Sequence, residues 1–174
     1  MRVAFCMPVE APAPRRSVRR ESKDKKCRAL QTIGSRIITG ARGPAVLTQI
    51  AELIQRECHY RWIGIYKIRR HEFVIEAATN KMKPAAPRFP VTQGLSAEAV
   101  ETRKTLLVPD VSKDARFIPN FWTTKSEIIV PIIDDEHDRV VGTIVAESAE
   151  LNAFDKKDRD FLEGVAGLIW RVLV

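Results

Sequence analysis

The stretch from Ser126 to Ser148, SEIIVPIIDDEHDRVVGTIVAES, limits what this chain can fold into more than any other part of it. Two runs rich in β-branched residues, 126–133 and 139–148, flank a charged five-residue turn, and this pattern predicts a β-hairpin. Apolar side chains of the first run alternate to both faces, so this strand needs cover on both sides. We expect a packed helical layer on one face and, on the other, a cover that can enclose a ligand.

Two carboxylates mark one face of this hairpin. Glu127 and Glu147 stand at its two far ends and share the parity of a single face. A carboxylate at the end of a buried strand either accepts hydrogen bonds from loop amides or meets a ligand. The ligand interpretation makes these two residues the first candidates for function, and bonding to loop amides is the alternative.

The remaining elements complete a mixed pattern of helices and strands. Apolar spacing predicts helices at 17–39, 45–58, 95–103 and 155–172, and strands at 61–68, 73–78 and 105–108. Short connections between neighbouring strands favour an antiparallel sheet. We expect an α+β fold with the long N-terminal and C-terminal helices on one face of a central antiparallel sheet.

Two irregular stretches are left to cover the other face. Residues 79–93 contain three prolines and are predicted to hold no regular structure, and residues 112–124 carry several aromatic side chains. Long loops in a compact domain often cover a site. Together with the short helix they are expected to cover a pocket, with Phe121 and Trp122 as a hydrophobic plug or, alternatively, as a ligand-gripping loop.

Positive charge is concentrated near the N-terminus. Residues 1–28 hold nine of the 29 basic residues against three acidic ones, so most of the formal charge of +7 lies there. We interpret 1–16 as a disordered basic arm with prolines, and 17–174 as one domain. The nearly neutral domain predicts no nucleic-acid surface. The basic run 15–26 is interpreted as a solvated tail, with acidic lipid or nucleic acid as the alternative partner.

Cysteine usage and hydropathy exclude several classes of protein. The three cysteines, Cys6, Cys27 and Cys58, form no CxxC pair, which argues against a disulfide framework or a thiolate zinc site. No run of the sequence approaches the roughly 20 apolar residues of a membrane span. We therefore expect a cytoplasmic protein that needs no metal and no cofactor and makes no membrane contact.

Four strings resemble the GAF domain family: FPVTQGLSAEAVETRKTLLVPDVSKDARF (89–117), SEIIVPI (126–132), VVGTIVAES (140–148) and FDKKDRDFLEGVA (154–166). They follow one another in the family's order, and the resemblance covers about residues 30–172. It implies a small-molecule-binding module of signal transduction, often a homodimer through its terminal helices or coupled to a separate signalling protein. The family's cyclic-nucleotide signature is not matched, and no cysteine is placed to attach a bilin.

Within the family, the strings are most similar to those of the free methionine-(R)-sulfoxide reductases. RWIGIY (61–66) resembles their NW-x-GFY strand, and SEIIVP (126–131) resembles their SEIV-x-P strand. The resemblance implies that Trp62, Tyr66 and Glu127 hold a free amino acid. It also places Glu147 where an Asp is usual, and Val145 at the position of a second Asp.

Strand parity agrees with this assignment independently. Trp62 and Tyr66 point to one face of their strand, with Gly64 leaving a gap between the two rings, and Thr143 shares a face with Glu147. Two carboxylates and two aromatic rings facing a covered hollow would suit an amino-acid-like ligand or a small cation. Ordinary core packing is the alternative for the aromatic residues.

The chain departs from the reductases at the residues that carry their chemistry. Reduction of a sulfoxide needs an attacking thiolate and a second thiol that resolves the intermediate as a disulfide. The family's cysteine positions align with Ala86, Ser96 and Asn120 in this chain. We therefore expect no reductase activity and no catalytic residue, and we count Ser96 and Asn120 among the pocket residues.

Three hypotheses follow from these observations. The first is a sensory or regulatory domain that binds a small molecule and acts through dimerisation or a partner chain. The second is an enzyme of the reductase type with displaced cysteines, and the third is a protein-interaction module whose vestigial pocket is filled by its own side chains. The predicted ligand-binding residues are Trp62, Tyr66, Ser96, Asn120, Glu127, Thr143, Val145 and Glu147.

Overall fold

The computed structural model describes residues 15–79 and 84–174, and it describes side chains of the first helix from residue 24 onward. Residues 1–14 of the predicted arm lie outside the described residues, and so does Cys6. Residues 15 and 16, also assigned to the arm, belong instead to the first helix, α1 (Arg15–Ile38). The prediction of an unstructured arm therefore extended two residues too far.

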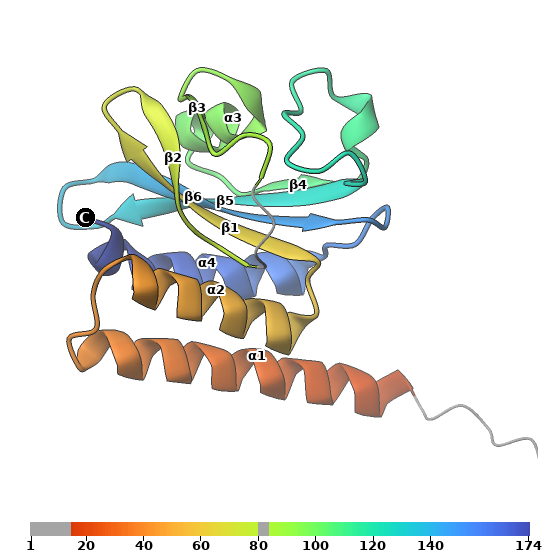
Figure 1. Cartoon of the computed structure of the whole chain (residues 1–174). Helices are drawn as coiled ribbons and strands as arrows, with labels where there is room; N and C mark the ends of the chain where they lie inside the picture. Colours follow the sequence, from red (N-terminus) through yellow and green to blue (C-terminus); the bar gives the residue numbers. More distant parts are fainter. Residues whose placement is uncertain (1–14, 80–83) are drawn as a thin grey trace, which may run out of the picture.

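Six strands form one antiparallel sheet in the order β3-β2-β1-β6-β5-β4. The hairpin predicted between Ser126 and Ser148 provides its two adjacent strands β5 and β6. The expected antiparallel sheet is thus confirmed (Figure 1). The strand bounds are Trp62–Arg69 for β1, Glu72–Ala78 for β2, Arg88–Pro90 for β3, Leu106–Val108 for β4, Ser126–Asp134 for β5 and Arg139–Ser148 for β6.

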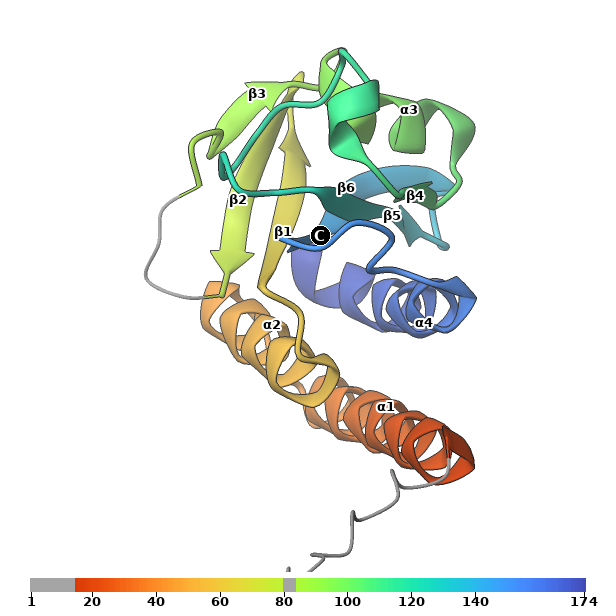
Figure 2. The same cartoon turned by 90° about the vertical axis from the view of Figure 1, so that its right-hand side faces the viewer.

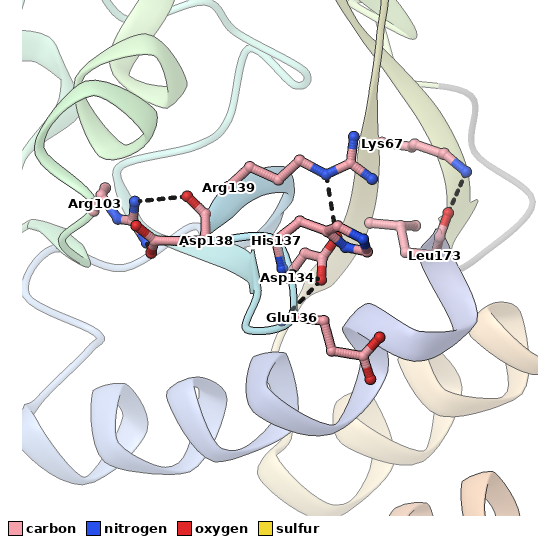
Figure 3. Close-up of polar contacts among 8 residues, drawn as sticks. All are labelled: Lys67, Arg103, Asp134, Glu136, His137, Asp138, Arg139 and Leu173. Atoms are coloured by element: carbon pink, nitrogen blue, oxygen red, sulfur yellow. Dashed lines mark hydrogen bonds and ion pairs between the residues drawn. The ribbon is translucent and has the colours of Figure 1, made fainter.

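The turn of this hairpin is organised by the buried carboxylate of Asp134. It accepts hydrogen bonds from the backbone N–H of Glu136 (3.1 Å) and from Nε of Arg139 (3.1 Å), and the ring of His137 lies 2.9 Å from it (Figure 3). Burial acts to raise the pKa of Asp134, but these hydrogen bonds outweigh it and hold the pKa below its ordinary value. A polar turn between two apolar strands therefore closes without leaving this carboxylate unpartnered.

Helices cover one face of the sheet in two layers. The helices α2 (Pro44–Cys58) and α4 (Lys156–Leu173) pack directly on the strands, and α1 packs against α2 and α4 from outside (Figures 1 and 2). Pro44 stands at the first position of α2, where its missing N–H costs no helical hydrogen bond. Asp155 caps α4 and forms a capping box with Asp158. The predicted helical layer is confirmed, with α1 as its outer part.

The other face is covered by α3 (Gly94–Thr102), β3, the 3-10 turn η1 (Val111–Lys113) and the loops around them (Figure 2). The prediction that 79–93 holds no regular structure is wrong for 88–90, which pair with β2 as β3. Prolines argued against a strand here, yet β3 is an edge strand, where a missing backbone donor is tolerated.

In the part of the chain that the structure describes, no helix is both long enough and apolar enough to cross a membrane.

Candidate ligand-binding site

The predicted polar face exists, and register places its residues in one row across three strands. Trp62 of β1 lies opposite Glu147 of β6, which in turn lies opposite Glu127 of β5. Tyr66 lies opposite Thr143 in a parallel row further along the same face. These side chains point away from α2 and α4 toward the loops, as the alternation of residues along each strand predicts.

The loops enclose a small cavity above this face. Its volume is about 20 Å³, which suffices for a single water molecule. Five of the eight predicted residues line it, and Trp62, Thr143 and Glu147 are buried on the same face without lining it. The lining residues are Tyr66, Ala86, Phe89, Gly94, Leu95, Ser96, Ile118, Asn120, Glu127, Ile129 and Val145.

Glu127 is the most unusual residue of the cavity. Its side chain has no hydrogen-bond partner among the described residues, and the residue is only 5% exposed. Burial raises the pKa of its carboxyl well above the usual 4.5, and the nearby charge of Glu147 raises it further. A buried carboxylate without a partner is costly, so it marks the cavity as a place for a donor or a cation.

Glu147 has the opposite surroundings although it is also fully buried. Asn120 donates a hydrogen bond from Nδ2 to Oε1 (2.8 Å), and the Thr124 hydroxyl donates to Oε2. Burial raises the pKa of Glu147, and these two hydrogen bonds together with the charge of Arg61 partly offset that effect. The alternative role foreseen for these carboxylates, bonding to a loop, is thus realised at Glu147 through side chains.

The aromatic residues fill their face more completely than the sequence indicated. The gap expected above Gly64 is occupied by the indole ring of Trp62 itself, which a Cβ at position 64 would overlap. Phe121 packs edge-on against Trp62 with ring centroids 5.5 Å apart. The predicted plug is therefore right for Phe121, but it is wrong for Trp122, which is 91% exposed. Sequence alone does not specify which of two adjacent loop residues turns inward.

Two buried donors on this face of the sheet are unpaired. Within residues 15–79 and 84–174, Nε1 of Trp62 and Oγ1 of Thr143 are buried without a hydrogen-bond partner. The hydroxyl of Tyr66 is partnered, because its hydrogen bond is shared between the carbonyl of Ala86 and Oδ1 of Asn120, both at 3.1 Å. Burial raises the pKa of Tyr66, so its hydroxyl stays protonated and donates at neutral pH.

The first residues of α3 were not predicted as part of the site beyond Ser96. Gly94 and Leu95 line the cavity with Ser96, and none of the described side chains caps this end of the helix. The first backbone N–H groups of a helix have no partner within the helix and carry its partial positive charge. Gly94 has a φ of 76°, which indicates why a glycine begins this helix.

The positions aligned with the reductase cysteines gather at the cavity. Ala86, Ser96 and Asn120 all line it, although they come from three different segments. The two cysteines that the structure describes lie on helices of the opposite face: Cys27 is exposed on α1, and Cys58 ends α2. Burial raises the pKa of the Cys58 thiol to about 11, which keeps it protonated at neutral pH.

The contact between Thr124 and Glu147 could not be predicted from the sequence. Thr124 bonds a glutamate 23 residues further along the chain, and no periodicity connects two such positions. In the described ranges, no group of three or more His, Cys, Asp or Glu side chains is placed to hold a metal ion. The polar groups that line the cavity are the carboxylate of Glu127, the amide of Asn120 and the hydroxyl groups of Ser96 and Tyr66.

Comparison with known proteins gives consistent matches. The family model described as GAF domain matches residues 44–174. "GAF domain-containing protein A" of Dictyostelium discoideum is 27% identical over 135 residues, which cover 76% of this chain and 83% of that protein. The "Free methionine-R-sulfoxide reductase" of Saccharomyces cerevisiae is 33% identical over 109 residues, which cover 62% of this chain and 60% of that protein.

Solved structures extend these matches. The free methionine-R-sulfoxide reductase of Neisseria meningitidis, in complex with its substrate, superposes with a TM-score of 0.76 at 24% identity, covering 85% of this chain and 87% of that chain. The reduced form of fRMsr of Staphylococcus aureus gives a TM-score of 0.72 at 25% identity, covering 88% and 95%. At these identities the likeness rests mainly on the fold.

Proposed function

Because the chain belongs to the GAF domain family, we propose that its loop-covered face binds a small molecule with an ammonium group or another cationic group, and that occupancy regulates a partner. The observation that carries this proposal is Glu127, a buried carboxylate at the cavity with no hydrogen-bond partner among the described residues. A bound cation would supply a charge partner for the Glu127 carboxylate.

Electrostatics favour a cation at this place. Ionising Glu127 in a buried position is costly, and the neighbouring Glu147 increases the cost. A ligand cation offsets the cost of burying the charge of Glu127 and the repulsion from Glu147, because it attracts both carboxylates. The ring of Tyr66, which lines the cavity, adds a surface that attracts a desolvated cation.

A second part of the cavity lining favours a negative group. The uncapped N-terminus of α3 borders the cavity, and helix N-termini bind carboxylates through their free N–H groups. Glu127 and this helix end together form a site with complementary ends. A free amino acid carries both charges on one carbon and is the ligand class that we propose.

Signal output would pass through the helices on the other face. The long helix α1 packs along α2 and α4, and α4 packs on β5, the strand that carries Glu127 (Figure 1). We propose that the protein forms a homodimer through its terminal helices, or contacts a separate signalling protein, in a reducing cytoplasm where its cysteines remain free thiols. The oligomeric state is measurable by light scattering coupled to size-exclusion chromatography.

A second candidate function is reduction of free methionine sulfoxide. It is favoured by the 33% identity to the yeast reductase and by the substrate complex of the Neisseria enzyme. Against it stand the residues at the cavity, where Ala86, Ser96 and Asn120 offer no thiol to attack sulfur or to form a disulfide. We therefore propose binding without this chemistry.

Thermal unfolding against a ligand panel tests the proposal. The panel contains free amino acids, methionine sulfoxide, simple monoamines and nucleotides, each with wild type, Glu127→Gln and Glu136→Gln. The last variant is the matched control, because Glu136 is an exposed glutamate in the β5–β6 turn. A ligand at 100 times its Kd adds about 2.7 kcal/mol to stability, so a shift of several degrees is expected for an amine-bearing compound.

The outcomes separate the three functions. A shift that Glu127→Gln abolishes and Glu136→Gln retains supports the proposed site. No shift with any compound contradicts it and favours an interaction module. Thiol-dependent loss of methionine sulfoxide, abolished by replacing one of the cysteines with serine, would establish the enzyme instead.

A further inference from the structure

Asn120 connects the two loops that cover the cavity to the sheet beneath it. Its Nδ2 donates to Glu147 on β6, and its Oδ1 accepts the hydrogen bond of Tyr66 on β1. Its backbone carbonyl accepts a hydrogen bond from the N–H of Ala85 in the other loop (3.2 Å). One residue that is 8% exposed thus joins two strands and both covering segments.

The side-chain amide has a single orientation that satisfies its neighbours. A carboxylate accepts hydrogen bonds only, so Nδ2 must face Glu147, while Oδ1 must face the hydroxyl of Tyr66. Thr124 donates to the second oxygen of Glu147, and Phe121 packs on Trp62 between these two anchors. Segment 120–124 is therefore fixed to the sheet at three positions, Asn120, Phe121 and Thr124.

We propose that Asn120 is a built-in occupant of the site, which holds both covering loops closed and must leave Glu147 before a cationic ligand can bind there. We call this closed arrangement, in which Asn120 joins both covering loops to the sheet, the lock. The lock is inferred from the contacts above, and the displacement of Asn120 by a ligand rests on the proposed function. The side-chain amide of Asn120 donates a hydrogen bond to Glu147. A ligand ammonium would donate to the same carboxylate.

Cavity size makes displacement necessary. The cavity of about 20 Å³ holds one water molecule and is too small for an amino acid. Of the two buried glutamates on this face, Glu127 has no hydrogen-bond partner among the described residues, whereas each oxygen of Glu147 already accepts one hydrogen bond. Hydrogen bonds between an ammonium and a carboxylate are stronger than those from a neutral amide, so an ammonium group can replace Asn120 at Glu147.

The lock predicts an effect of opposite sign to that of an ordinary binding residue. Replacing Asn120 removes the competitor and raises the fraction of open protein, and apparent affinity rises with that fraction. Replacing Glu127 removes the attraction and lowers affinity. Residue 120 thus lowers the apparent affinity for every ligand and favours ligands that carry a charged donor.

Hydrogen exchange followed by mass spectrometry tests the lock without any ligand. For Asn120→Ala, exchange of backbone amides in 84–93 and 114–125 is expected to accelerate at least about tenfold, with exchange in β1 and β6 unchanged. Thr123→Ala is the matched control from an exposed position of the same loop and should behave as wild type. Exchange in Asn120→Ala equal to wild type would overturn the lock.

Two additional variants protect the test against a folding defect. Asn120→Ser retains a small polar side chain that is too short to span both Tyr66 and Glu147, and it should accelerate exchange in both segments. Thr124→Val removes the second hydrogen bond to Glu147 only, and acceleration should be confined to 114–125. A poorly folded variant is recognised by accelerated exchange in β1 and β6, and exchange equal to wild type in the variants that pass this check would exclude the lock.

Calorimetric titration with L-methionine and L-methionine sulfoxide tests the displacement. Asn120→Ala is expected to bind one of them about tenfold more tightly than wild type, with Thr123→Ala unchanged. Equal or weaker binding by Asn120→Ala would overturn displacement while leaving the proposed function standing. Absence of binding by every variant, together with accelerated exchange, would overturn the proposed function and the displacement step but support the lock.

Discussion

Both sides of the sheet bury carboxylates, and Asp158 on one side and Glu127 on the other have different surroundings. On the helical side, Asp158 accepts hydrogen bonds from Lys26 of α1 (2.7 Å) and from the Tyr60 hydroxyl (2.5 Å). Burial acts to raise its pKa, but these hydrogen bonds outweigh burial and hold the pKa below its usual value. On the loop side, Glu127 has no such partner among the described residues, and burial raises its pKa.

This difference separates a carboxylate that stabilises the fold from one that is available to a ligand. Asp158 joins α1 to α4 and completes the cap of α4 through the Asp155 N–H (2.8 Å). Removing its charge should cost stability. Glu127 contributes no comparable contact, and its retention in a buried place is consistent with a role in binding. The four predictions below test this contrast, from the largest expected effect to the smallest.

Two adjacent isoleucines of β5 allow the contribution of packing to stability to be compared between the two sides of the sheet. Ile128 packs into the helical core, and Ile129 points to the loop side, where it lines the cavity. Truncation of a buried isoleucine to alanine costs about 2–5 kcal/mol, and the cost is smaller where the surroundings can collapse. We expect about 4 kcal/mol for Ile128→Ala and about 2 kcal/mol for Ile129→Ala by urea denaturation. Equal costs would contradict a more adaptable loop side.

Neutralising Asp158 should destabilise the protein at neutral pH. Hydrogen bonds to charged groups contribute about 1.5–3 kcal/mol, so Asp158→Asn is expected to cost about 2 kcal/mol at pH 7. Because the folded pKa of Asp158 is depressed, its contribution is present above the unfolded value of 3.8 and is lost as pH falls through the folded pKa. The cost measured at pH 3 should therefore be smaller than at pH 7; a cost independent of pH would contradict this assignment.

Neutralising Glu127 should have the opposite sign. Its folded pKa is raised, so its favourable contribution is present below 4.5 and is lost as pH rises through the folded pKa. Glu127→Gln is expected to be more stable than wild type at pH 8 by about 1 kcal/mol, because the wild-type carboxylate is then charged and buried without a hydrogen bond. At pH 4 the two proteins should be similar. Destabilisation by Glu127→Gln at pH 8 would show that the carboxylate is partnered in solution.

Trp122 provides the smallest expected effect. Although it is large and apolar, it is almost fully exposed beside the inward-facing Phe121. Trp122→Ala should therefore change the free energy of unfolding by no more than about 0.5 kcal/mol. Its removal also leaves Trp62 and Trp170 as the remaining tryptophans, both buried, so emission should shift to shorter wavelength. A large loss of stability would mean that this part of the cover packs differently.

The sequence predicts the strand faces well because their period is local. Alternation placed Glu127 and Glu147 on one face of their hairpin, and the resemblance added Trp62 to the same pocket; register shows that these three residues form one row. The resemblance to GAF domains, which the family match confirms, added the expectation of a covered pocket. Both inferences depend on residues close together in the chain or on strings that match as a block.

The contents of the pocket could not be predicted in the same way. The bond from Asn120 to Glu147 joins residues 27 apart, one of them in a loop without periodicity. The position of the Trp62 ring above Gly64 depends on a side-chain rotamer and on Phe121, which packs against it. Such contacts follow from how the loops close over the sheet, and local patterns contain no information about that closure.

Calorimetric titration tests the central claim most directly, that Glu127 makes the loop-covered face a site for a cationic group. L-Methionine and L-methionine sulfoxide would be compared with their deaminated analogues on wild type and Glu127→Gln. We expect binding to an amine-bearing compound, no binding to its deaminated analogue, and at least about a hundredfold loss in Glu127→Gln, which corresponds to about 2.7 kcal/mol. Equal binding of both analogues, or unchanged binding by Glu127→Gln, would contradict this role of Glu127.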